Sequence, residues 1–252
     1  MSNVKLVRKL AQKKFRNELK LFVAEGLRLC EEVPPAQIKF GFYTRDFLLE
    51  ERARILVERI KKFAPLEEIS PLTLEKISDT QTPQGILLIV QQNFSTLAEV
   101  VAKKIIVALD GVQDPGNVGT ILRTAAAFDC GVILLGGSAE LFNPKVIRSS
   151  MGAIFYLPVV AMSQEEFLQE MQSHNAEILA AAVDSSAEIY FRHDFAQNPV
   201  AIVFGSEALG VSKKILDATR KIFIPMCGHA ESLNVATSAA IIISEVIRQS
   251  SL

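Results

Sequence analysis

The residues from Lys104 onward alternate continuous apolar segments with helical patterns, and this alternation limits the fold more than any other sequence feature. Apolar runs predict strands over residues 105–109, 131–135, 154–158, 177–183, 201–204 and 221–224. Helical spacing predicts helices over residues 118–128, 143–149, 164–173, 212–218 and 235–249. Strands that are apolar throughout and joined by helices indicate an α/β fold, whose parallel sheet is covered on both faces.

The residues before Lys104 show a shorter α/β pattern. They predict helices over residues 4–15, 27–32 and 45–63, strands over 21–24, 38–43 and 86–90, and a turn at 82–85. Pro34 and Pro35 end the second helix, because proline cannot continue a helix. We therefore expect a smaller α/β domain over residues 1–92, a linker over 93–104 and a larger domain over 105–252.

The formal net charge of −1 conceals two halves of opposite charge. Residues 1–104 carry 18 Lys or Arg against 13 Asp or Glu, whereas residues 105–252 carry 9 against 15. Within the first 28 residues alone, eight basic residues stand against two acidic ones. Such asymmetry indicates an anionic partner for the first half, with a solvated helix face as the alternative.

Several classes of protein are excluded or disfavoured by composition. No apolar run approaches the roughly 18–20 residues that cross a bilayer, so we expect no membrane segment. The three histidines lack metal-ligand spacing, and we predict no bound metal. The three cysteines lie far apart without a CxxC motif, which favours reduced thiols in an intracellular protein. The basic N-terminus lacks the apolar core of a secretory signal but has some likeness to a mitochondrial presequence; we expect a cytoplasmic protein.

Ligands of open parallel sheets bind beyond the carboxyl ends of the strands, and three segments rich in glycine and small polar residues fall there. The first covers residues 109–119, where Pro115–Gly116 predicts a turn and Asn117 an N-cap. Arg123 follows on the polar side of the helix, where its guanidinium can reach a ligand phosphate or hydroxyl. The alternative is that Asn117 only caps the helix and Arg123 forms a surface ion pair.

The second and third segments cover residues 204–210 and 224–236. The chain has no GxGxxG, no phosphate-loop Lys-Ser/Thr and no GxSxG, which disfavours a dinucleotide enzyme and a serine hydrolase. Glu207 is either a functional carboxylate or a charge at a helix N-terminus. Ser232 and Asn234 precede a terminal helix that is apolar nearly all round, so this helix is buried within its domain or against a second chain.

Together the three segments resemble the signature motifs of the SpoU/TrmH family of RNA ribose 2′-O-methyltransferases, in the SPOUT superfamily. The matching stretches are Asp114–Gly119 with Arg123–Ala125, Gly205–Glu207 with Gly210, and Ile224–Met226 with Ser232–Ala236. The N-terminal part is similar to the family's ribosomal-protein-like substrate-binding domain through residues 22–26 and 82–85, and residues 148–153 resemble its connecting segment.

This resemblance implies an S-adenosyl-L-methionine-dependent enzyme with a trefoil-knotted C-terminal domain. It also implies a homodimer formed through the knot region and the C-terminal helix, and an RNA substrate. The separate N-terminal domain favours rRNA. A tRNA ribose methyltransferase and a catalytically silent RNA-binding homologue are the alternatives.

Carried onto this sequence, the family's site residues fall into three groups. The catalytic and substrate-orienting positions are Asn117, Arg123, Glu207, Ser232 and Asn234. The cofactor-binding positions are Gly205, Ile224, Met226 and Leu233. For RNA binding, the basic candidates are Lys9, Lys13, Lys14, Arg16 and Arg148. An arginine is a poor base because its pKa exceeds about 12, so we expect Arg123 to hold the target phosphate or hydroxyl and to stabilise developing negative charge.

Overall fold

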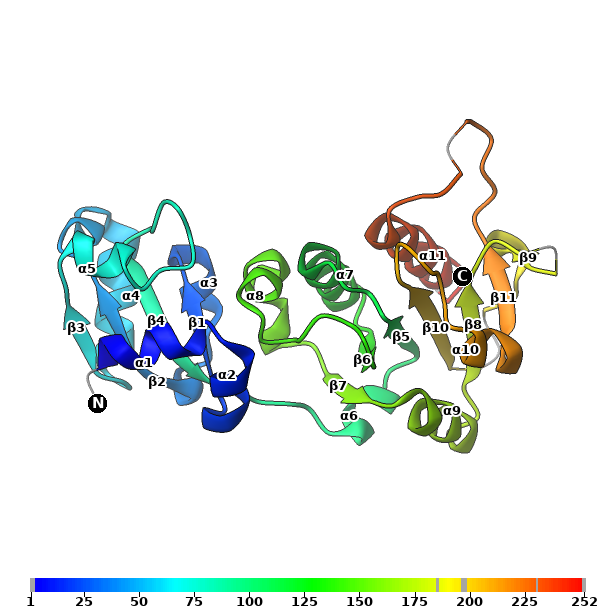
Figure 1. Cartoon of the computed structure of the whole chain (residues 1–252), viewed down its shortest axis with the longest axis horizontal. Coiled ribbons are helices and arrows are strands. Elements are labelled where there is room, and N and C mark those ends of the chain that lie inside the picture. The colour runs from blue at the N-terminus through cyan, green and yellow to red at the C-terminus, as the bar shows by residue number, and fades with distance from the viewer. Residues whose placement is uncertain (1–2, 185, 196–198, 230, 251–252) are drawn as a thin grey trace. The chain divides into compact units, whose positions relative to one another are not determined.

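The computed structural model describes residues 3–184, 186–195, 199–229 and 231–250 (Figure 1). The chain divides into two compact units, which are described separately below. One unit comprises Met1–Asn93 together with Leu141–Phe155, and the other comprises Phe94–Glu140 together with Tyr156–Leu252. The second segment of the first unit lies inside the region that the sequence analysis assigned to the larger domain.

The first unit is an α/β unit built on a four-stranded sheet in the order β1-β4-β2-β3. Strand β4 runs antiparallel to both β1 and β2, and β3 runs parallel to β2. Its strands are β1 (Leu21–Glu25), β2 (Ile38–Tyr43), β3 (Leu66–Glu68) and β4 (Ile86–Gln91). Its α-helices are α1 (Asn3–Leu10), α2 (Lys13–Leu19), α3 (Leu27–Glu32), α4 (Glu51–Lys61), α5 (Pro71–Glu75) and α8 (Pro144–Ser150). Three-residue or four-residue 3₁₀ helices cover Pro35–Gln37, Asp46–Leu49 and Ala153–Phe155.

Aromatic packing explains why residues 141–155 join the first unit. Phe22 on β1 is 1% exposed, and its ring centroid lies 5.0 Å from that of Phe142 and 6.2 Å from that of Phe155. Helix α8 lies between these two aromatic residues in sequence and packs against β1. Burial of large aromatic surfaces is a strong driving force for association, and the helical spacing of 143–149 gave no indication of which sheet it would cover.

The predicted helix over residues 4–15 is broken into α1 and α2. Gln12 adopts an extended conformation between them, and Arg16 stabilises the break. Arg16 is 3% exposed, and its guanidinium donates hydrogen bonds to the carbonyl oxygens of Leu10 (2.9 Å) and Ala11 (2.8 Å). Carbonyl groups at the end of a helix lack partners within the helix, so Arg16 supplies hydrogen-bond donors to the carbonyl groups at the end of α1. We therefore correct its assignment as an RNA-binding residue, because its charged group faces the interior of the unit.

The second unit contains a seven-stranded sheet in the order β7-β6-β5-β10-β8-β11-β9, in which every neighbouring pair is parallel. This confirms the α/β fold with a parallel sheet. The strands are β5 (Ile105–Asp110), β6 (Gly131–Leu135), β7 (Val159–Met162), β8 (Glu177–Ala181), β9 (Glu188–Ile189), β10 (Val200–Gly205) and β11 (Arg220–Phe223). The helices are α6 (Leu97–Val101), α7 (Pro115–Ala127), α9 (Gln164–Ser173), α10 (Lys213–Ala218) and α11 (Val235–Ser250), with a 3₁₀ helix at Tyr190–Arg192.

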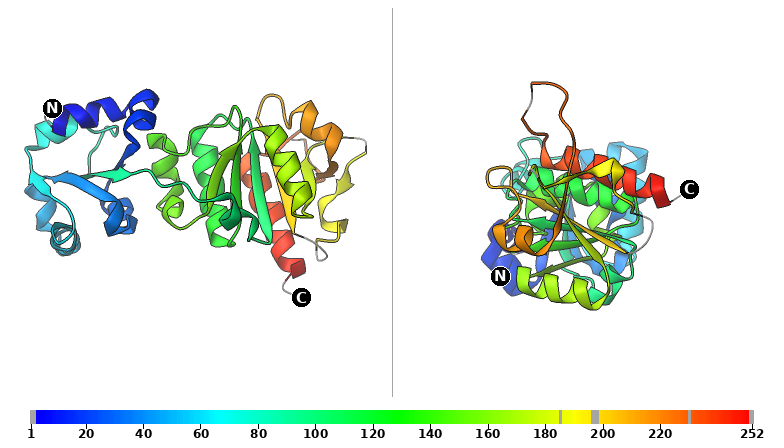
Figure 2. Two further views of the ribbon diagram at one scale, coloured as in Figure 1. Left: turned by 90° about the horizontal axis from the view of Figure 1, so that it is seen from below. Right: turned by 90° about the vertical axis from the view of Figure 1, so that its right-hand side faces the viewer.

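Helices cover both faces of this sheet (Figure 2). On β5, Ile106 and Ala108 belong to a buried cluster that includes Phe167 and Met171 of α9 and Ile215 of α10. Successive side chains of a strand point to opposite faces, so the residues between them meet the other layer. Helices α7 and α11 pack against each other and against β6 and β10 in that layer.

Two expected elements differ from the sequence prediction. The strand predicted over residues 154–158 is wrong, because residues 153–155 form a 3₁₀ helix and β7 begins at Val159. Pro158 cannot donate to a sheet ladder, and its carbonyl instead accepts from Val132 N (2.9 Å). The helix predicted over 45–63 is a 3₁₀ helix followed by α4. Strands β3 and β9 are only three and two residues long, too short to produce a recognisable pattern.

The burial of Arg16 predicts a stability effect that surface lysines do not share. Arg16→Gln removes a guanidinium that satisfies two carbonyl oxygens, and we expect it to lower the free energy of unfolding by about 2 kcal/mol. Lys14→Gln is the matched control, because Lys14 is exposed on the same helix and surface substitutions usually change stability by no more than about 0.5 kcal/mol. Urea denaturation followed by circular dichroism measures both. Equal stabilities of the two variants would contradict the structural role of Arg16.

Candidate active site at the carboxyl edge of the parallel sheet

Helix α7 begins earlier than predicted, and this changes the role of Asn117. The N-cap is Asp114, whose carboxylate accepts from Gly116 N (3.2 Å), and Pro115 occupies the first helical position. Proline is favoured there because its missing N–H would have no helical partner. The expectation that Asn117 caps the helix is therefore wrong. Asn117 lies in the first turn, where its carboxamide contacts other segments.

A chain of hydrogen bonds joins the three segments singled out from the sequence. Asn117 Nδ2 donates to Glu207 Oε1 (2.5 Å), on the loop after β10. Asn117 Oδ1 accepts from Asn234 Nδ2 (2.9 Å), at the start of α11. The linked residues are 90 and 117 positions apart in sequence. The structure thus brings together Asn117, Glu207 and Asn234, as expected for parts of one site.

Asn234 has a second role, as the cap of α11. Its Oδ1 accepts from the backbone N–H groups of Ala236 (2.9 Å) and Thr237 (3.3 Å), which have no partner within the helix. One carboxamide therefore caps α11 with its oxygen and donates to Asn117 with its nitrogen. Because α11 also packs along α7 (Figure 1), the position of Asn234 is fixed from two sides.

The loop after β10 folds back tightly on the strand. Ser206 and Gly210 exchange backbone hydrogen bonds of 3.1 and 2.9 Å, and Ser206 Oγ accepts from Leu209 N (3.0 Å). Gly210 has φ +69°, which favours glycine. A Cβ at Gly205 would collide with the backbone of Gly210 and Val211. Both glycines are thus needed for the turn that carries Glu207.

Asp110 is a residue that the sequence analysis missed. It ends β5, in register with Gly205 on β10, and is only 4% exposed. Its carboxylate accepts from Ser212 N (2.8 Å) and from Gln164 Nε2 (2.7 Å), which fixes the far end of the loop after β10. An acidic residue directly after a fully apolar strand was the available signal, since a buried carboxylate requires donors.

The four expected cofactor positions lie on loops that follow strands of the parallel sheet. Gly205 ends β10, whereas Ile224 and Met226 follow β11 and are half-buried. Leu233 lies just before α11 and is 37% exposed. Half-buried apolar side chains next to the backbone of these loops suit a ligand with an aromatic ring and a polar tail. The residues present therefore fit an organic cofactor bound largely through backbone groups.

Arg123 and Ser232 are exposed and stand apart from the hydrogen-bonded chain. Across residues 3–184, 186–195, 199–229 and 231–250, no side chain forms an ion pair or hydrogen bond with the Arg123 guanidinium. The surface ion pair considered as the alternative is absent from this described part. The guanidinium is free to meet an external anion, about 1.7 turns along α7 from Asn117.

The remaining basic candidates lie in the first unit. Lys13 and Lys14 are exposed, and Lys9 lies 5.1 Å from the centroid of the Phe15 ring. Arg148 on α8 forms an ion pair with Asp79 (2.5 Å) and keeps 34% of its side chain exposed. These lysines and Arg148 remain candidate RNA contacts, in contrast to the buried Arg16.

Neither a metal site nor a membrane span is found among the described residues. No group of three or more His, Cys, Asp or Glu side chains in those ranges is placed to hold a metal ion. No helix within them is long and apolar enough to cross a membrane. Cys30 and Cys130 are buried and Cys227 is exposed, all three as free thiols. Burial is the main cause that raises the pKa of the Cys130 thiol to about 12.

Comparison with known proteins identifies the protein family to which this chain belongs. The SpoU rRNA Methylase family matches residues 104–244, and an MRM3-like substrate binding domain matches residues 2–88. The chain therefore belongs to the SpoU methylase family. It is 31% identical over 242 residues to the 23S rRNA (guanosine(2553)-2′-O)-methyltransferase RlmP of Bacillus subtilis, which covers 95% of this chain and 94% of that protein.

Two solved structures cover nearly the whole chain. An AdoMet-bound rRNA methyltransferase from Sinorhizobium meliloti matches with a TM-score of 0.86 at 29% identity, over 97% of this chain and 94% of that one. The SpoU methyltransferase AviRb from Streptomyces viridochromogenes, in complex with AdoMet, matches with a TM-score of 0.86 at 25% identity, over 99% and 98%. The likeness thus extends over both units.

The two roles of Asn234 are separable by substitution. Asn234→Ala removes the cap of α11, and we expect it to lower the free energy of unfolding by about 1 kcal/mol. Asn234→Ser keeps a capping oxygen but no longer reaches Asn117, and its stability should stay within about 0.5 kcal/mol of the parent. Urea denaturation distinguishes the two variants. If Ala and Ser were equally destabilising, capping would not be the stabilising role of Asn234.

Proposed function

We propose that this protein transfers a methyl group from S-adenosyl-L-methionine to a ribose 2′-hydroxyl of rRNA. The observation that carries the proposal is the hydrogen-bonded chain from Glu207 through Asn117 to Asn234, which unites the three motifs at one edge of the sheet. The names of relatives over both units support it, since they describe 2′-O-methyltransferases acting on rRNA.

Methyl transfer to a hydroxyl requires alignment of the two reactants and removal of one proton. S-Adenosyl-L-methionine supplies a methyl group activated by a sulfonium centre. The loop ending in Gly205, with Ile224, Met226 and Leu233, would hold this cofactor. Asn117 and Asn234 fix the Glu207 carboxylate at the edge of the site. Ser232, exposed two residues before Asn234, would orient the substrate.

Arg123 would act on the RNA side of the reaction. Its guanidinium is exposed and free of ion pairs among the described residues, so it can bind a phosphate next to the target ribose or the reacting oxygen itself. An arginine remains protonated at neutral pH and only donates hydrogen bonds. Arg123 therefore stabilises the developing negative charge, and the proton leaves to another group or to water.

The first unit would bind RNA through its basic residues. Lys9, Lys13 and Lys14 occupy helices α1 and α2, and Arg148 lies on α8. Cationic side chains bind the phosphate backbone without sequence selectivity and release its counterions. This assigns the positive half of the sequence to substrate attraction. The domain boundaries 1–92 and 105–252 remain our proposal for the functional division of the chain.

We also propose that the second unit is knotted and dimeric. The family resemblance supports the knot, and α11 returns after β11 to pack on β10 and α7. Ala240, Ile241 and Ile247 of α11 are only half-buried, which supports burial against a second copy. We also propose a cytoplasmic location, because widely spaced cysteines without a CxxC motif favour an intracellular protein.

The proposed reaction is tested by mapping ribose methylation of total rRNA after incubation with the protein and S-adenosyl-L-methionine. We expect one 2′-O-methylated nucleotide that is absent without the protein. Arg123→Lys should lower the rate about 100-fold or more, because a lysine cannot reproduce the guanidinium fork that stabilises charge.

The control is Arg54→Lys, since Arg54 is an exposed arginine of α4 in the first unit. It should methylate at the parental rate. An rRNA without a new 2′-O-methyl group would reject the proposed function, whereas near-normal turnover by Arg123→Lys would reject only the role of the guanidinium.

The proposed dimer is tested by analytical ultracentrifugation. Ile241→Asp places a charge on the half-buried face of α11, and we expect it to convert a dimer into a monomer. Ile55→Asp is the matched control, because Ile55 is 60% exposed on α4 in the first unit. A monomeric parent protein at micromolar concentration, or a dimeric Ile241→Asp variant, would contradict the assignment of α11 as the interface.

A further inference from the structure

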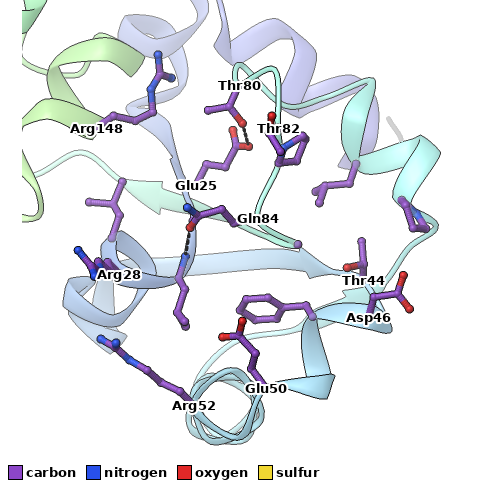
Figure 3. Close-up of a pocket in the computed structure, with 18 of the residues that line it drawn as sticks. Glu25, Arg28, Thr44, Asp46, Glu50, Arg52, Thr80, Thr82, Gln84 and Arg148 are labelled. Carbon is purple, nitrogen blue, oxygen red and sulfur yellow. Dashed lines mark hydrogen bonds between the residues drawn. The ribbon is translucent and has the colours of Figure 1, made fainter.

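A cavity of about 1110 Å³ opens in the first unit and is lined only by residues of that unit (Figure 3). Its volume is slightly larger than the range of roughly 300–1,000 Å³ that is usual for ligand pockets. We propose that it binds one unpaired nucleotide of the RNA substrate and selects a base that carries an amino group. This inference rests on the proposed function, because it takes RNA as the substrate.

Hydrogen bonds within the protein hold one wall of the cavity in place. Glu25, at the end of β1, is 9% exposed, and its carboxylate accepts hydrogen bonds from Thr80 Oγ1 (2.7 Å), from Asp79 N (3.3 Å) and from the Ser78 hydroxyl. A buried carboxylate with three donors holds residues 78–80 in place. Preformed walls lower the entropy lost on binding.

The same wall is fixed at its other end by Gln84. Its Oε1 accepts from Leu27 N (3.1 Å), the first N–H of α3. Gly26 has φ +96°, and a Cβ there would lie 2.8 Å from Gln84 Oε1, so only glycine permits this contact. Residues 78–85 are therefore held against the start of α3 at both ends.

Charged side chains of both signs line the cavity. Figure 3 shows Arg28, Arg52 and Arg148 along one side, and Asp46 with Glu50 on others. Arg52 pairs with Glu31 and Arg148 with Asp79. Arg28 is exposed and forms no ion pair with any residue that the structure describes. This free guanidinium suits a phosphate.

The remaining lining suits a base. Phe47 and Leu74 are 9% and 2% exposed, and together with Pro83 they contribute apolar side chains to the lining. Unpaired bases of RNA are recognised by stacking on such surfaces and by hydrogen bonds to their edges. Asp46 and Glu50 are exposed carboxylates that only accept. They favour the amino groups of adenine, cytosine and guanine over uracil, which has none.

The test uses the full-length protein without cofactor and a pool of RNA hairpins whose loop sequence is random. Bound hairpins are sequenced, and we expect enrichment of amino-bearing bases over uridine at one loop position. Arg28→Gln should weaken binding of the enriched hairpin about tenfold, the effect of about 1.4 kcal/mol. Thr82→Trp, which places a large ring at the lining, should abolish the enrichment.

Arg54→Gln is the control for Arg28→Gln, because it removes the same charge from an exposed arginine of the first unit that does not line the cavity. It should keep the parental enrichment. A parent protein that enriches no base, or enriches uridine, overturns the inference, as does a Thr82→Trp variant that folds and selects as the parent does. Methylation mapping distinguishes failure of this inference from failure of the proposed function. A protein that methylates rRNA but selects no base in the hairpins would contradict only the proposed nucleotide site in the cavity.

Discussion

The carboxamide of Asn117 is the contact on which the candidate active site depends. It donates to Glu207 and accepts from Asn234, so a single side chain links the loop after β10 to the start of α11. Its availability follows from the N-terminus of α7, where Asp114 supplies the cap and Pro115 starts the helix. Had Asn117 been the cap, as the sequence indicated, its oxygen would bond its own helix and the three segments would lose their common partner.

The parallel sheet was predictable because burial on both faces makes its strands apolar throughout. Predicted strands 105–109 and 131–135 correspond to β5 and β6. Order along the chain was also enough to place the motifs at the carboxyl edge. The strand predicted over 154–158 is wrong although its segment is apolar, like those of the strands that were predicted correctly. Phe155 packs on Phe22 in the first unit. A local apolar pattern does not show whether a residue is buried in a strand or against an aromatic side chain elsewhere.

Net charge describes a whole half of the sequence, whereas the structure shows which individual basic side chains are exposed and which are buried. Lys14 and Arg16 both contribute to the positive first unit, yet Lys14 is exposed and Arg16 is buried against the carbonyl groups of α1. A count of basic residues treats the two alike. Only the break between α1 and α2, set by the extended conformation of Gln12, shows which of them can meet a phosphate.

In both units a buried carboxylate holds a loop in place. Asp110 holds the loop after β10 through Ser212 N, and Glu25 holds residues 78–80 through one backbone and two hydroxyl donors. A buried charge is costly unless donors surround it. Opening either loop would therefore leave a buried carboxylate without hydrogen-bond donors. This cost favours the closed loop even without a ligand. The same physical device thus orders the loop that carries Glu207 and the wall of the cavity, and a loop ordered in advance loses less entropy when a ligand binds.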